Sequence, residues 1–483
     1  MAQSKIRKGF FFYFGLFVLL LVAIFLVCLV IMMFNPGATI LWMKYFTPKE
    51  EFVKVEKLTD TGESVAYGGI KGITVNCDYA NVIVTANKDY TDTGIKIINK
   101  TRGFTAAKNA KDFGYSLTKA GEELVLDVQE PTGFLFFSKQ IDVLIYSNEA
   151  TWAYGDEFKL TVVSEGSSNV EFGRVKENEG TIKVHEIDIQ TESGDVIFRD
   201  TCDVSQMTGG VRITSKSGKI GASSTTFSVG SDVELSTVKG KINFDTVNVG
   251  THKLAISNTR GAVSINNINA GKVEVKCAKG NFYFKKVNAD LDFTSSIDNM
   301  ISPNITVDEI VGGFKLEADG DKKTVSPEIN IAKISGALFV AAQNGKLNVK
   351  EANGQVYVIS TDSLSENVVI GAANQNNIHL ENVKGLLKIG FKGVVASNVS
   401  LANKSAKIEV NFTKVARFDT LAKKYDGNDV IDKDISISIG DNSVTYNADK
   451  RCQLSVEGTS GVTGHIDLTT DSKIAYTLLE KVA

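Results

Sequence analysis

The sequence predicts an all-β protein, built as a β-solenoid and preceded by one N-terminal transmembrane helix. The first observation is composition: 42 Gly but only 5 Pro and 2 Trp among 483 residues, with many Val, Ile, Asn, Ser and Thr. Such a mixture favours short strands joined by tight turns. The second observation is a short Gly-led motif that recurs along most of the chain, and the third is an uncharged apolar run near the N-terminus.

The apolar run has no charged residue from Gly9 to Met43, and it is almost wholly apolar between Phe10 and Phe34. A helix needs roughly 20 apolar residues to span a bilayer core, so the run is long enough. A cleaved signal peptide is the alternative, but its apolar region has about 7–15 residues and ends at small residues. This run is longer and ends in Met-Met-Phe-Asn-Pro, so we expect an uncleaved anchor.

The residues that flank the run orient it. Lys5, Arg7 and Lys8 precede it with no acidic residue among them, which favours a cytoplasmic N-terminus and an extracellular body. The aromatic residues that follow suit the headgroup zone of a bilayer: Trp42, Tyr45 and Phe46. The sequence therefore predicts a single-pass protein of the cell membrane, with the lipid bilayer as its first partner.

One local pattern then recurs: Gly, a polar residue, an apolar residue, any residue, an apolar residue. The copies begin at Gly194, Gly240, Gly261, Gly271, Gly280, Gly336, Gly345 and Gly354. Each copy predicts a strand of about five residues whose side chains alternate between a buried and an exposed face. We expect the glycine to adopt positive φ at the corner that precedes each strand.

A five-residue strand cannot bury its apolar side alone, so successive copies must stack. Two strands per turn give a coil of about 18–22 residues, the size of a β-helix coil rather than a propeller blade. A Greek-key sandwich is the alternative, and it would show longer strands and no fixed glycine register.

These repeats, together with strand-like runs such as 73–77, 81–84, 124–128 and 141–146, resemble the bacterial "putative-adhesin" β-helix families. Those families are domains of unknown function with Gly-x-Val/Ile-x-Val/Ile repeats, and the resemblance covers roughly residues 65–475. It implies a single-stranded right-handed β-helix. It implies no catalytic residues, because the families have none to carry over.

The chain divides into five predicted segments. These are a cytoplasmic tail (1–8), the transmembrane helix (9–34), a juxtamembrane connector (35–64), an irregular β region that opens the solenoid (65–180) and the β-helix repeat domain (181–475).

The most conspicuous local feature outside the repeats is the cluster Phe134, Leu135, Phe136 and Phe137. Alternation would bury at most two of these side chains, and exposed apolar clusters mark interfaces. Three interpretations stay open: the cluster caps the end of the solenoid core, contacts a partner or another copy, or touches the bilayer.

Charge and motifs exclude several functions. The net charge is −3, from 53 basic and 56 acidic residues without a charge run, so we expect no nucleic acid partner. The five Cys have no CxxC pair and the four His are scattered, so we expect no metal or cofactor. Cys77 and Cys277 follow the two-residue strand alternation and are predicted core residues.

No catalytic motif is complete, so we expect no enzyme activity. The leading hypothesis is a non-enzymatic adhesin or interaction scaffold on the cell surface, which binds a glycan, a protein or copies of itself. The alternatives are a subunit of a membrane-bound assembly or filament, and a carbohydrate-active β-helix enzyme.

Overall fold

The structure is a computed structural model of the whole chain. It describes residues 2–34, 52–59, 70–100, 102–103, 114–129, 137–138, 141–148, 157–173, 182, 184–199, 207–222, 226–295, 300–317, 324–371, 376–392, 398–412, 417–428, 435–438, 443–446, 452–455 and 463–478.

The first element is one long helix, α1 (Ala2–Phe34), which includes the predicted tail as well as the predicted span. The large apolar side chains described along it, between Tyr13 and Val30, are exposed. Within the described part of the chain, no helix combines the length and apolar character needed to cross a membrane. The transmembrane span over residues 9–34 therefore stays a prediction.

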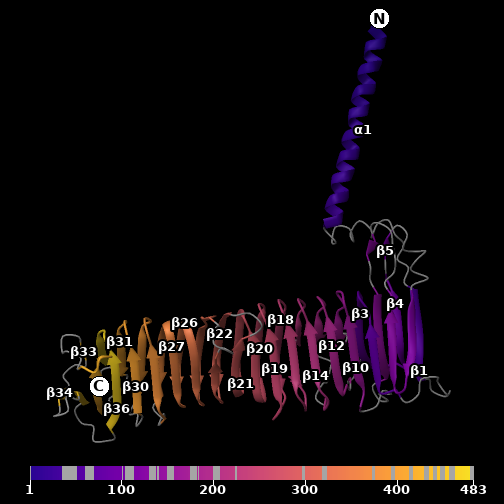
Figure 1. The fold of residues 1–483 in the computed structure, drawn as a ribbon. Helices are drawn as coiled ribbons and strands as arrows, with labels where there is room; N and C mark the ends of the chain where they lie inside the picture. Colours follow the sequence, from indigo (N-terminus) through magenta and orange to yellow (C-terminus); the bar gives the residue numbers. More distant parts are fainter. Residues whose placement is uncertain are drawn as a thin grey trace.

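The rest of the described chain is β structure, arranged as one long stack of strands (Figure 1). The N-terminal strands are β1 (Phe52–Thr59), β2 (Gly72–Asn76), β3 (Ala80–Asn87), β4 (Thr93–Asn99), β5 (Arg102–Gly103), β6 (Tyr115–Ala120), β7 (Glu123–Val128), β8 (Phe137–Ser138) and β9 (Ile141–Asn148).

The middle of the stack holds β10 (Lys159–Ser164), β11 (Val170–Phe172), β12 (Glu186–Thr191), β13 (Val196–Phe198), β14 (Val211–Ser215), β15 (Ile220–Ala222), β16 (Thr226–Ser228), β17 (Val233–Thr237), β18 (Lys241–Asn248), β19 (Lys253–Asn258), β20 (Ala262–Cys277), β21 (Lys279–Ser295), β22 (Met300–Ile310), β23 (Phe314–Leu316), β24 (Thr324–Val325) and β25 (Glu328–Ile334).

The C-terminal part holds β26 (Leu338–Ala352), β27 (Val356–Ile370), β28 (Ile378–Asn382), β29 (Leu387–Phe391), β30 (Asn398–Asn403), β31 (Ile408–Phe412), β32 (Arg417–Lys423), β33 (Ile435–Ser438), β34 (Ser443–Tyr446), β35 (Cys452–Ser455), β36 (Thr463–Thr470) and β37 (Ile474–Leu478).

Two long parallel ladders run the length of the stack, and we call them face A and face B. Face A joins β7, β2, β10, β12, β14, β17 and β19 and continues to β30 and β36. Face B joins β9, β3, β11, β13, β15 and β18 and continues to β31 and β37. Long strands such as β20 serve both faces, because residues 262–265 pair on face B and residues 272–277 on face A. The predicted β-solenoid is confirmed, whereas its right-handedness stays a prediction.

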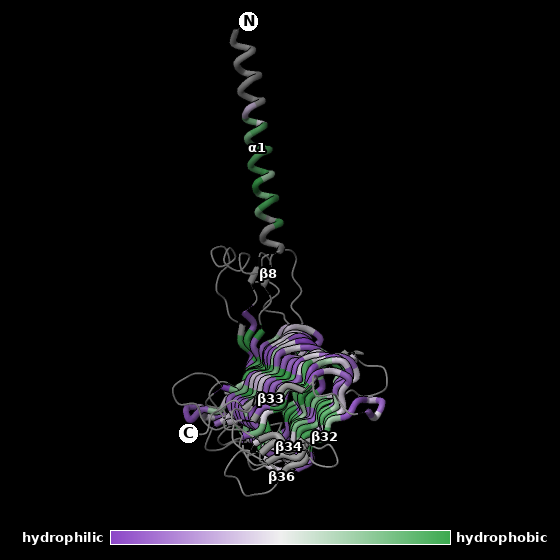
Figure 2. The backbone as a smooth tube through the Cα atoms, turned by 90° about the vertical axis from the view of Figure 1, so that its left-hand side faces the viewer, coloured by the Kyte–Doolittle hydropathy of each residue, from purple (hydrophilic) through white to green (hydrophobic). Residues whose placement is uncertain are grey.

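The core consists of apolar side chains that lie directly above one another in successive coils. On face A one such row is Leu124, Ile73, Leu160, Ile187, Val211, Val233, Leu254, Val273, Leu291, Phe314, Leu338, Val356, Ile378, Val399 and Ile466. Every member is buried. In the view of Figure 2 the coils superimpose, with hydrophobic and hydrophilic positions alternating along each strand. This stacking gives short strands the continuous core that none could form alone.

The order of coils at both ends differs from the order in the sequence. At the N-terminal end, β2 lies between β7 and β10, so the first coil lies inside the second. At the C-terminal end, β36 lies between β30 and β32, so the last coil also lies inside the stack. Antiparallel strands then cover the outermost coils: β6 on β7, β4 on β9, β1 on β4, and β35 on β32.

The repeat glycines occupy the predicted corners but mostly for a different reason than the predicted one. Of the eight quoted, only Gly280 and Gly345 have positive φ, at 128° and 123°. The others allow close approach between coils. A Cβ on Gly240 would lie 1.9 Å from the carbonyl oxygen of Gly218, and one on Gly261 would lie 1.9 Å from that of Gly240. The glycines are therefore required where one coil's corner rests on the next.

A buried polar side chain precedes many of these corners by three residues, a signal that the sequence analysis missed. Each accepts a hydrogen bond from the backbone N–H three residues later, over 2.5–3.2 Å: Thr191, Ser215, Thr237, Asn258, Asn382 and Asn403. Several also donate to a carbonyl of the neighbouring coil, such as Ser215 to Gly194 over 2.9 Å. The readable pattern is Thr, Ser or Asn, then two residues, then Gly.

We predict that Gly240→Ala destabilises the solenoid, because the new methyl group would overlap the carbonyl of Gly218. Overpacking of this kind costs roughly 1–3 kcal/mol in free energy of unfolding, measurable by urea denaturation. Gly210→Ala is the matched control, because a Cβ at Gly210 would meet no atom within 4 Å. Equal stability of the two variants would contradict the close-approach explanation.

Candidate binding surface

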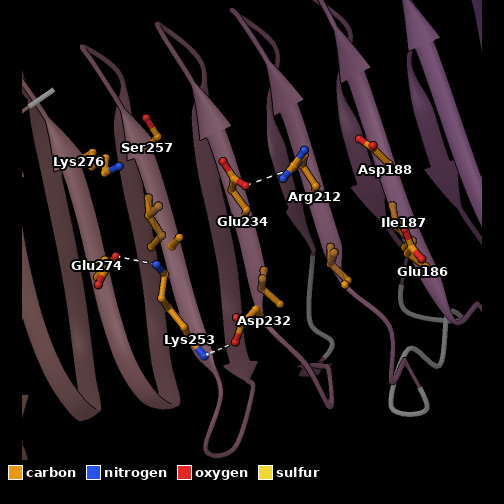
Figure 3. Close-up of a pocket in the computed structure, with 15 residues that line it drawn as sticks. Glu186, Ile187, Asp188, Arg212, Asp232, Glu234, Lys253, Ser257, Glu274 and Lys276 are labelled. Carbon is orange, nitrogen blue, oxygen red and sulfur yellow. Dashed lines mark hydrogen bonds and ion pairs between the residues drawn. The ribbon is translucent and has the colours of Figure 1, made fainter. Parts of the chain in front are cut away.

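A shallow groove of about 580 Å³ crosses the outer side of face A near the middle of the stack (Figure 3). Outward side chains of β12, β14, β17, β19 and β20 line it. The charged members are Glu186, Asp188, Arg212, Asp232, Glu234, Lys253, Glu274 and Lys276. Its volume lies within the range of small-molecule sites.

The groove exists because one outward row contains a small residue among long ones. Arg212, Glu234, Ala255 and Glu274 are aligned in four successive coils. Side chains in such a row are one strand spacing apart, about 4.8 Å, so a long side chain would normally fill each position. The methyl group of Ala255 leaves a hollow between Glu234 and Glu274.

Ion pairs fix the charged walls on both sides of Ala255. The Arg212 Nε lies 3.2 Å from an oxygen of Glu234, and the Lys253 Nζ lies 2.8 Å from an oxygen of Glu274. Lys272 also contacts Glu274, at 3.1 Å. Pairs this exposed contribute only about 0–1 kcal/mol each to stability, so they favour these side-chain positions only weakly.

The titration of Glu274 does not suit general acid catalysis. Hydrogen bonding to Lys253 lowers the pKa of Glu274, so this carboxyl is a poor general acid. Among the described carboxyl groups, only Glu366 has a raised pKa, and it is buried in the core away from the groove. Glu274 therefore serves as a negative charge and hydrogen-bond acceptor in the groove.

Further along the same outward row, the side chains become aromatic. The rings of Phe339 and Tyr357 are stacked with centroids 5.4 Å apart, and those of Tyr357 and His379 are 5.1 Å apart. Lys315 lies 5.6 Å from the Phe339 ring centroid and covers its other face. Because the rings cover one another's faces, this stack stabilises contacts between coils and offers a ligand little ring face.

The residues singled out from the sequence lie elsewhere. Phe10 lies within α1 and Phe34 is its last residue, while Trp42, Tyr45 and Phe46 lie outside the described residues. Phe134, Leu135 and Phe136 also lie outside them. Phe137 begins β8, which pairs with β5 in a two-stranded sheet separate from the solenoid. The contact proposed for this cluster stays a prediction.

The described cysteines and metal-binding residue types form no reactive or metal centre. Cys77 and Cys277 are buried, as predicted, and burial raises the pKa of the Cys277 thiol to about 12. In the described parts of the chain, no group of three His, Cys, Asp or Glu residues could hold a metal ion.

The strand pairings define the class of protein: a β-solenoid. No protein-family model matches the chain, and no curated protein matches it. Two solved structures do. One, described as a "putative adhesin" from Bacteroides fragilis, is 13% identical with a TM-score of 0.22, over 60% of this chain and 97% of that one.

The other, described as a "putative cell adhesion protein" from Clostridium sporogenes, is 9% identical with a TM-score of 0.14. It covers 89% of this chain and 98% of its own. Membership of the putative-adhesin families stays a prediction.

One residue in the core of face B departs from the apolar pattern. The aligned row there is Val143, Val82, Val170, Val196, Ile220, Ile242, Val263, Phe282, Ile305, Ile329, Leu347, Glu366, Leu387, Ile408 and Ile474. Glu366 is 1% exposed, and its Oε1 accepts a hydrogen bond from Asn382 over 3.2 Å. Its Oε2 has no hydrogen-bond partner. Burial raises its pKa well above the ordinary 4.5.

The stability of the solenoid should therefore depend on the pH through Glu366. Its contribution is fully present below pH 4.5 and is lost as the pH rises through the raised folded-state pKa. Within that window this one group lowers the free energy of unfolding by about 1.4 kcal/mol per pH unit. Urea denaturation at several pH values measures the slope.

Glu366→Gln is the matched variant, because its amide oxygen can accept the same hydrogen bond from Asn382 but cannot ionise. We expect the variant to lose this part of the slope and to gain stability relative to the wild type as the pH rises. Parallel pH profiles for the two proteins would show that Glu366 does not carry the dependence.

Proposed function

We propose that this chain is a non-enzymatic adhesin that binds a surface glycan in the groove over Ala255. The observation that carries the proposal is the groove itself, a hollow in an otherwise regular charged face. Its walls present carboxylates beside ammonium and guanidinium groups. Because a sugar hydroxyl both donates and accepts hydrogen bonds, a glycan can use both kinds of group.

The rigidity of the walls supports the same proposal. Most lining residues belong to strands that are paired on both sides, so the backbone beneath the groove is fixed. A preformed site loses less conformational entropy on binding than a mobile one. The groove therefore suits a ligand that must be held without being altered.

Filling the groove should abolish binding. We predict that Ala255→Arg reduces affinity at least tenfold for any glycan that the wild type captures on a glycan array. The arginine would lie between Glu234 and Glu274 and continue the alternation of charge, so the fold should persist. Dissociation constants from biolayer interferometry, with immobilised glycan, measure the effect.

Ser264→Arg is the control, because Ser264 lies on face B of the same coil and is also half-buried and outward. This variant should bind like the wild type. Equal loss of binding in both variants, or none in either, would place the glycan site elsewhere. Capture of proteins but not glycans would assign the groove to a protein partner, and release of reducing ends from the glycans would indicate an enzyme.

The proposal includes a membrane anchor formed by the N-terminal helix, with the N-terminus in the cytoplasm and the solenoid outside the cell. The uncharged run from Gly9 to Met43 supports it, as do the exposed apolar side chains of α1. An exposed apolar surface of this extent is rare in a protein dissolved in water.

We predict that Leu20→Arg with Ile24→Arg releases the full chain from the membrane fraction in an alkaline extraction. Each arginine near the centre of a span costs roughly 2.5–3.5 kcal/mol on insertion scales. Leu20→Phe with Ile24→Phe should leave the chain in the membrane pellet. Recovery of the wild type in the supernatant would argue against the anchor.

Assembly into a filament by end-to-end stacking of coils is the other candidate, and the described ends of face A disfavour it. Antiparallel β6 and β35 cover outer coils of face A, so a second copy cannot simply continue the parallel ladder there.

A further inference from the structure

The N-terminal end of the solenoid has two outermost strands, β6 on face A and β1 on face B. Among the described strands, β6 pairs only with β7 and β1 pairs only with β4. The outward side chains of β6 include Ser116 and Thr118, which are polar and exposed. The outward side of β6 is therefore polar, unlike that of β1.

Strand β1 presents apolar side chains at its exposed edge. Val53 is 45% exposed and Val55 is 46% exposed, and the two lie on the same side of the strand because they are two residues apart. An exposed edge strand with apolar side chains is a template for pairing with another chain. Natural edges usually avoid this combination.

The opposite side of β1 carries two opposite charges, Lys54 and Glu56. Lys54 lies 4.9 Å from the ring centroid of Tyr115, whose hydroxyl donates a hydrogen bond to Glu56. The aromatic ring of Tyr115 thus holds both side chains at the end of the stack. They are close to the edge that a second strand would approach.

These residues make β1 complementary to itself in one antiparallel register. If Val55 faces Val55 of a second copy, each Lys54 faces a Glu56, giving two opposite-charge pairs. Moving the centre of the pairing by one residue sets Lys54 against Lys54 or Glu56 against Glu56. Opposite charges across a strand pair stabilise it and like charges destabilise it, so charge selects the first register.

We infer that β1 is a homodimerisation edge, at which two copies of this chain pair antiparallel about a two-fold axis through Val55. The pairing extends the β9–β4–β1 order, which is already antiparallel, by one further strand. It joins two solenoids at their N-terminal ends and leaves the groove on face A of each copy open. This inference does not depend on what the groove binds.

A single cysteine tests the two-fold axis directly. In the proposed register the two Val55 Cα atoms are about 4.5–5.5 Å apart, within reach of a disulfide. The two Val53 positions are offset by four residues along the strands, about 13 Å, and are out of reach. The full chain in detergent, with Cys28→Ser as background, is compared with Val55→Cys and Val53→Cys under mild oxidation.

We expect Val55→Cys to become a covalent dimer, while Val53→Cys and the background protein stay monomeric on a non-reducing gel. Absence of a Val55→Cys dimer overturns the inference, as does equal cross-linking of both variants. Light scattering of the wild type, without cross-linking, should show a dimer that dissociates on dilution. A protein that is monomeric at every accessible concentration would also overturn the inference.

A charge swap separates pairing from damage to the fold. Lys54→Glu alone sets two carboxylates opposite each other in each half of the interface, and we expect the dimer to weaken at least tenfold. Adding Glu56→Lys restores two opposite-charge pairs and should restore the dimer. Failure of the double variant to recover, in a protein with the wild-type circular dichroism spectrum, would rule out this register.

Discussion

In-register parallel pairing between successive coils is the interaction on which the rest of this structure depends. It aligns equivalent positions of successive coils, so that apolar side chains form continuous inner rows and polar side chains form continuous outer rows. It also brings the corners of neighbouring coils so close that a single Cβ, as at Gly240, would overlap a backbone carbonyl. The Thr, Ser and Asn side chains buried at these corners satisfy the backbone groups that the turns leave unpaired.

The same register controls the electrostatics of the surface. A charge in one coil lies beside a residue of the next, and many such neighbours have opposite sign: Lys159 with Glu186, Arg212 with Glu234, and Lys286 with Glu309. Pairing of this kind leaves little net field, in agreement with the near-neutral sequence. A surface of this kind exerts little long-range attraction on a charged molecule, so local shape and hydrogen bonding would decide what the proposed groove at Ala255 binds.

The sequence was sufficient for the solenoid because alternation and glycine spacing are local signals. It did not predict that β2 lies between β7 and β10, or that β36 lies between β30 and β32. The order of coils depends on contacts between distant segments. The sequence also did not reveal why glycine is required at the corners, because the close approach involves two coils at once. The groove could not be found from motifs, because it arises where Ala255 aligns with larger residues from other coils. Glu366, by contrast, looks ordinary until its register partners, Leu347 and Leu387, are known.

The placement of the last coil has a mechanical consequence. Strand β36 is flanked by β30 on one side and β32 on the other, so it is not the outermost strand of face A. A pull on the C-terminal end therefore loads two strand interfaces together instead of peeling one edge. The pull on the last coil is shared between these two strand interfaces. The coil that takes the load at this end is thus paired on both sides, with β30 and with β32.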